Sequence, residues 1–114
     1  AARPAAGLYV TSITVAEILH GVALLPAGRR RDAIRAAAES MFEVEFGDHV
    51  LPFDGPAARA YASIAADRRH AGRPISAFDA QIAATALVAR ASLATRNVAD
   101  FEGCGVKLLN PWDA

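Results

Sequence analysis

Four oxygen-bearing side chains stand out as candidates for chemistry because they follow expected strands or begin an expected helix. They are Glu17, Asp79, Asn97 and Asp100. Ligands of open α/β sheets bind beyond the carboxyl ends of strands, so these side chains are expected to converge on one rim of a sheet. Oxygen-only ligands suit a hard cation such as Mg²⁺ or Mn²⁺. Such an ion can activate a water and neutralise charge on a phosphodiester, which makes phosphodiester hydrolysis a coherent chemistry.

Asp79 has two interpretations. Ser76 is expected to cap a helix, and Asp79 follows three residues later, where the acid of a capping box lies. As a helix-dipole partner it contributes about 0.3 to 1 kcal/mol. Positions i+3, i+4 and i+7 from Asp79 are Ile82, Ala83 and Ala86, which are expected to pack on the core. An acid on that face is unusual, so capping and metal binding both remain open.

Glu17 also has a structural interpretation. Residues 14–17 fit a capping box at the start of a helix that follows an expected strand at residues 8–13. Glu17 lies on the opposite side of that helix from Val15 and Val22, so the core does not require it. Two roles are therefore open for Glu17: the acid of a capping box, or support of a metal ion.

Expected strands and helices alternate along the 114 residues. Further strands are expected at 50–53, 92–95 and 106–109, and a long helix is expected at 29–45. Asp54 is expected to cap another helix that has Pro56 in its first turn. The alternation predicts one α/β domain over residues 1–114, with a largely parallel sheet and helices on both faces.

Composition narrows the class of protein. Twelve basic and twelve acidic side chains cancel, so global charge does not indicate a strong nucleic-acid binder. Local basic clusters at 29–31 and 68–73 are either phosphate contacts or solvated helix ends. The single cysteine, Cys104, excludes an internal disulfide framework and favours a reducing compartment. We find no membrane span or secretion signal, and therefore expect a cytoplasmic protein without a membrane partner.

Three stretches in order resemble PIN-domain ribonucleases, most closely the VapC and FitB-like toxins of bacterial toxin–antitoxin pairs. They read TSITVAEILHGVALLPAGRRR, PISAFDAQIAATAL and LATRNVADFEGCGVKLLNPW. The resemblance implies a three-layer α/β/α domain and a Mg²⁺-dependent endoribonuclease toxin, in which Mn²⁺ can substitute. It also implies a homodimer that a cognate antitoxin inhibits and that meets operator DNA only through the antitoxin. The alternative is a catalytically silent PIN-like module that binds an antitoxin partner.

The resemblance also assigns roles to the candidate residues. Glu17 matches the second acid of the family and Asp79 the third. Asp79 is an implied metal ligand, and Glu17 either supports the metal ion as a ligand or orients the water. The fourth acidic position is filled by Asn97 or by Asp100, and Asp100 is the one that could be a metal ligand. The amino-terminal family strand, which carries the first metal-binding aspartate, has no counterpart in these residues. We therefore expect the native molecule to carry an acidic strand before Ala1.

Overall fold

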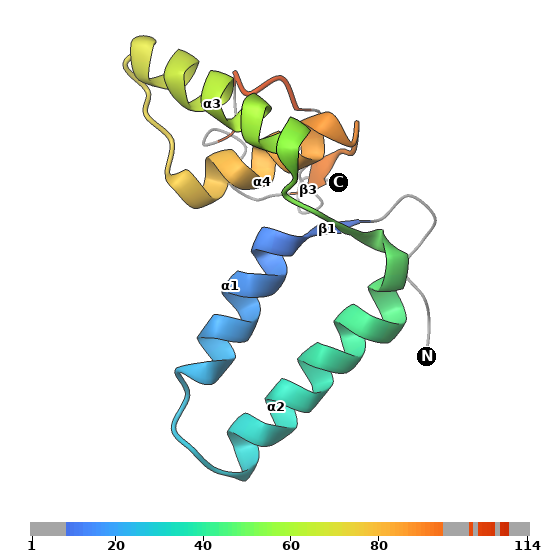
Figure 1. The fold of residues 1–114 in the computed structure, drawn as a ribbon. Helices are drawn as coiled ribbons and strands as arrows, with labels where there is room; N and C mark the ends of the chain where they lie inside the picture. The colour runs from blue at the N-terminus through green and yellow to red at the C-terminus, as the bar shows by residue number, and fades with distance from the viewer. Residues whose placement is uncertain (1–8, 95–100, 102, 107, 110–114) are drawn as a thin grey trace. The chain divides into compact units, whose positions relative to one another are not determined.

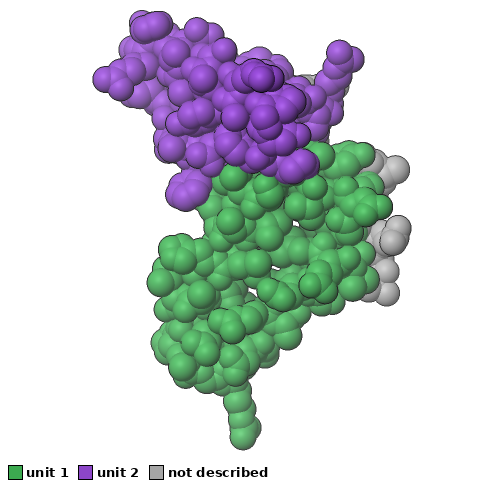
Figure 2. Space-filling model, in the orientation of Figure 1, with its two compact units in different colours: residues 1–51 green, residues 52–114 purple. Residues whose placement is uncertain are grey.

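The structure of the protein is a computed structural model that describes residues 9–94, 101, 103–106 and 108–109. The described residues are mainly helical, and their strands form two short pairs (Figure 1). The chain divides into two compact units, unit 1 with residues 1–51 and unit 2 with residues 52–114 (Figure 2). The organisation as one domain over residues 1–114 stays a prediction.

Unit 1 begins with a strand that leads directly into a helix. Strand β1, Val10–Thr11, pairs in parallel with β2, Val50–Leu51. Helix α1, Ser12–Ala23, starts at the next residue because Thr11 is its N-cap. The Thr11 Oγ1 accepts a hydrogen bond from the Thr14 N–H at 3.0 Å, which satisfies one of the free donors at the helix start.

The end of β1 and the start of α1 correct two predictions. The strand expected at residues 8–13 ends at Thr11, and Leu8 lies outside the described residues. The capping box expected at residues 14–17 is wrong, because the helix begins one turn earlier on the Thr11 hydroxyl. Ile13 is a good strand former, but the cap three residues before Thr14 determines the local structure.

The second half of unit 1 is a long helical segment. Helix α2, Arg29–Ser40, continues as a π-helical turn, Met41–Phe46, and then as a 3₁₀ turn, Gly47–His49. The helix expected at 29–45 is therefore present, with a wider last turn. Figure 1 shows α1 and α2 running side by side within this unit. The Phe42 side chain is buried in the π turn.

Unit 2 is built on two packed helices. Helix α3, Gly55–His70, begins at the predicted N-cap Asp54, whose Oδ1 accepts the Ala57 N–H at 3.2 Å. Helix α4, Ala77–Val88, has Ser76 as its N-cap, as the sequence predicted. Most of the residues that α4 buries are alanines, and α4 packs against α3. The core of this unit comprises Ile64, Ala80, Ala83, Ala84, Phe101 and Cys104.

The remaining strands of unit 2 are short. Strand β3, Leu93–Ala94, pairs in parallel with β4, Leu108–Leu109. Both lie within the strands expected at 92–95 and 106–109. Parallel pairing is thus confirmed in both units, and helices alternating with parallel strands confirm the predicted α/β class. Among the described residues, we find no helix with the length and apolar character that crossing a membrane requires.

Candidate functional site

Asp79 is held in the first turn of α4 by the cap that precedes it. Ser76 has an extended backbone, with φ −64° and ψ 154°, and its Oγ accepts the Asp79 N–H at 3.1 Å. The next amide, that of Ala80, donates to the Ser76 carbonyl at 2.9 Å. These two bonds fix the backbone of Asp79. Its side chain is partly buried, next to the fully buried Ala80.

The Asp79 carboxylate has no hydrogen bond or ion pair among the described residues. In particular, it does not accept the Ser76 N–H, so the reciprocal bond of a capping box is missing. The capping interpretation therefore reduces to a charge near the positive end of a helix. A partly desolvated carboxylate without a partner fits the requirement of a hard cation for oxygen donors.

Glu17 is exposed on α1, as predicted from its position opposite Val22, which is buried. Helix α1 begins at Ser12, so Glu17 lies in its second turn and cannot be the acid of a capping box. The structural interpretation of Glu17 is therefore wrong. Within the described residues its carboxylate makes no hydrogen bond or ion pair, and it is open to a cation.

The other two candidates, Asn97 and Asp100, lie outside the described residues. Which of them fills the fourth acidic position stays open. Over the described ranges, the histidine, cysteine and acidic side chains form no group of three or more that could hold a metal ion. Glu17 belongs to unit 1 and Asp79 to unit 2. Their convergence on one metal ion remains a prediction.

Sequence reasoning missed the role of Arg68. The cluster at 68–73 was expected to be solvated or to meet phosphate, but the Arg68 side chain is buried. Its Nε donates to the Arg73 carbonyl at 2.7 Å and its Nη1 to the Cys104 Sγ at 3.5 Å. A signal was present: Arg68 follows the buried Ile64 by four residues, which places both on one face of α3.

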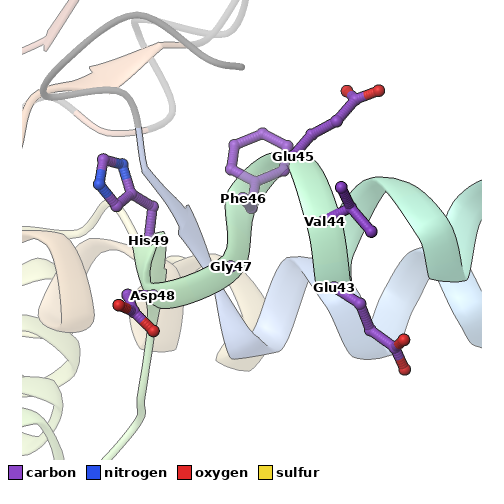
Figure 3. Close-up of a pocket in the computed structure, with 7 residues that line it drawn as sticks. All are labelled: Glu43, Val44, Glu45, Phe46, Gly47, Asp48 and His49. Carbon is purple, nitrogen blue, oxygen red and sulfur yellow. The ribbon is translucent and has the colours of Figure 1, made fainter. Parts of the chain in front are cut away.

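A cavity of about 300 Å³ in unit 1 is lined by residues 43–49. It carries three acidic residues, but in Figure 3 the Glu43 and Glu45 carboxylates point away from one another. His49 is engaged elsewhere, because its ring stacks on Tyr9 with centroids 4.4 Å apart. Diverging carboxylates do not enclose a cation, so this cavity is a poor metal site.

Known proteins resemble this chain along most of its length. Plasmid stability protein StbB of Pseudomonas syringae is 42% identical, over 94% of this chain and 77% of that protein. VapC ribonuclease Y4jK of Sinorhizobium fredii is 40% identical, over 93% of this chain and 76% of that protein. Toxin FitB of Neisseria gonorrhoeae is 38% identical, over 92% of this chain and 76% of that protein.

Solved structures show the same fold. The crystal structure of FitAcB from Neisseria gonorrhoeae matches with a TM-score of 0.88 and 37% identity, over 95% of this chain and 78% of that one. VapBC-5 from Mycobacterium tuberculosis, a member of the VapBC family of toxin–antitoxin systems, matches with a TM-score of 0.72 and 29% identity, over 90% and 80%. The model of the PIN domain matches residues 1–102. The chain therefore belongs to the PIN-domain family.

Proposed function

We propose that the native protein is the toxin of a toxin–antitoxin pair and that it hydrolyses RNA phosphodiester bonds with Mg²⁺. The names of two relatives, a VapC ribonuclease and toxin FitB, support the nuclease and toxin classes. The observation that carries the chemistry is the Asp79 carboxylate, which is partly buried, unpaired among the described residues and fixed at the start of α4.

The candidate residues share the binding of the ion in this proposal. Asp79 and Glu17 supply carboxylate oxygens to the ion, and Asp100 supplies a third. Asn97 takes that place if Asp100 does not. When bound, Mg²⁺, or Mn²⁺ in its place, lowers the pKa of a water and neutralises charge on the scissile phosphate. Ser76 contributes indirectly, because its hydroxyl fixes the backbone of Asp79.

The proposed partners follow from the same relatives. A solved neighbour at 29% identity belongs to a family of toxin–antitoxin systems, and we extend that partnership to this protein. The cognate antitoxin binds and inhibits the toxin, which acts as a homodimer, and operator DNA is contacted through the antitoxin alone. Co-purification of the tagged native protein from its own cells, followed by light scattering of the complex, tests this composition.

A cleavage assay tests the proposed reaction. The native protein, separated from its partner, is incubated with end-labelled RNA in the presence of Mg²⁺, with EDTA, and with EDTA followed by excess Mg²⁺ or Mn²⁺. We expect cleavage to stop with EDTA and to return with either ion, because the ion supplies the charge neutralisation. Cleavage that resists EDTA rejects the metal. A protein that binds its antitoxin but cuts nothing with either ion is instead the catalytically silent module.

A further inference from the structure

Arg68 is a cation inside the core of unit 2. Its residue is only 7% exposed, and it lies at the carboxyl end of α3. Taking a guanidinium out of water is unfavourable unless hydrogen bonds compensate for the lost hydration. A planar guanidinium also fixes the directions of its N–H groups. The bonds that Arg68 makes therefore define the geometry of the segments they join.

Those bonds close the connection between α3 and α4. The Arg73 N–H donates to the Arg68 carbonyl at 2.9 Å, and the Arg68 Nε donates back to the Arg73 carbonyl at 2.7 Å. The Nη1 of the same guanidinium donates to the Cys104 Sγ at 3.5 Å. Cys104 is 3% exposed and belongs to the core of this unit. Arg68 thus links the α3–α4 connection to Cys104, which packing in the core already holds in place.

The connection leads directly to the candidate site. Gly72 turns the chain with φ 75°, and Ile75 packs on the core before Ser76 caps α4. Only two residues separate Arg73 from Ser76, so a displacement of Arg73 is passed on to the cap and to the Asp79 backbone that the cap holds.

We propose that Arg68 is a positioning residue for Asp79, which sets the direction of the Asp79 carboxylate by holding the α3–α4 connection in place. The inference rests on the proposed function, because it takes Asp79 as a metal ligand. Supporting groups that orient a ligand typically change metal affinity about 10- to 100-fold when they are removed. The competing explanation is that Arg68 only stabilises the helix pair.

Metal binding separates these explanations without requiring catalysis. Mn²⁺ affinity of the native protein is measured by electron paramagnetic resonance for wild type, Asp79→Asn, Arg68→Met and Arg68→Lys. Arg69→Met is the matched control, because Arg69 is the exposed neighbour on the same helix. Thermal melting of every variant selects a temperature at which all are folded. If Arg68→Met does not fold, Arg68→Lys and Cys104→Ala, which removes the Sγ acceptor, take its place.

We expect Asp79→Asn to lose binding and Arg68→Met to bind Mn²⁺ about tenfold more weakly, with Arg69→Met unchanged. Arg68→Lys is also expected to be weaker than wild type, because an ammonium lacks the planar fork that reaches both acceptors. If Asp79→Asn loses binding while the folded Arg68 variants match wild type, this inference is overturned and the proposed function stands. If wild type and Asp79→Asn bind Mn²⁺ equally, both are overturned.

Discussion

Helices α2 and α4 each contain 12 residues and are rich in alanine, yet they differ in how much they bury. Helix α4 buries six residues, Ala80, Ile82, Ala83, Ala84, Thr85 and Ala86, and α2 buries none. The apolar residues of α2 form a narrow stripe between charged positions, while α4 is apolar nearly all round. A helix that is apolar on every side requires cover. Alanine content alone therefore does not decide which helix joins a core.

The two units do share their local signals. Helix α1 begins on the hydroxyl of Thr11 and α4 on that of Ser76, and each hydroxyl accepts the amide three residues later. The difference between the units thus lies in long-range packing. Unit 2 places Asp79 in the first turn of a helix that is buried along most of its length, and the cap holds its backbone. Unit 1 places Glu17 on an exposed helix face, where packing does not restrict its side chain.

The largest expected effect comes from Asp79→Asn, which tests whether the more buried unit, unit 2, carries the proposed chemistry. We expect RNA cleavage to fall about 100-fold or more, because a metal-binding charge is lost. The free energy of unfolding should change by less than about 1 kcal/mol, since only a helix-dipole interaction is removed. Initial rates and urea unfolding measure the two effects. Asp67→Asn, an exposed acid of α3, is the control, and equal rates for the two variants would refute the assignment.

Enlarging an alanine in each unit sharpens the comparison of packing. Ala83→Leu places three extra carbons where the residue is 0% exposed, so we expect a loss of about 1 to 3 kcal/mol in unfolding free energy. Ala37→Leu on the exposed side of α2 should change it by less than about 0.5 kcal/mol. Urea denaturation gives both values. Similar losses at the two positions would show that α2 is covered in the native protein.

Removing the two caps tests whether the local signals are equivalent. Ser76→Ala and Thr11→Ala should each cost about 1 kcal/mol, because each leaves one helix amide without its acceptor. Ser76→Thr and Thr11→Ser keep a hydroxyl and should recover most of the loss. Thermal unfolding of the four variants provides the comparison. If only one of the two alanine variants lost stability, the two caps would share their geometry but not their contribution to stability.

The smallest effect is expected at Arg90, the described non-glycine residue with a positive φ, 56°. It follows the last turn of α4, where the Ala91 N–H donates to the Ala86 carbonyl at 2.9 Å, and glycine is favoured there. Arg90→Gly should raise stability by less than about 1 kcal/mol, because relief of the left-handed strain is partly offset by chain entropy. Arg90→Ala retains the left-handed strain and should not raise the stability. If Arg90→Ala also raised the melting temperature, the cause would be loss of the arginine side chain and not relief of backbone strain.

Much of the fold and part of the candidate site followed from local patterns in the sequence. Short spacings predict the caps at Asp54 and Ser76 and the outward position of Glu17, and the alternation of strands and helices predicts the parallel pairing. The start of α1 was missed although it too is local. Thr11, Ser12 and Thr14 all carry hydroxyls suited to a cap, and the sequence prediction used Thr14 whereas the chain uses Thr11.

The role of Arg68 depended on tertiary structure. Its neighbours Arg69 and His70 are exposed, and the run as a whole is typical of a solvated helix end. The guanidinium is buried because Cys104, 36 residues later, packs against α3 and supplies an acceptor. Helix periodicity specifies which residues share a face of α3. Whether that face accepts a charge is decided by the segment that covers it, since only a hydrogen-bonded guanidinium can leave water at a tolerable cost in free energy.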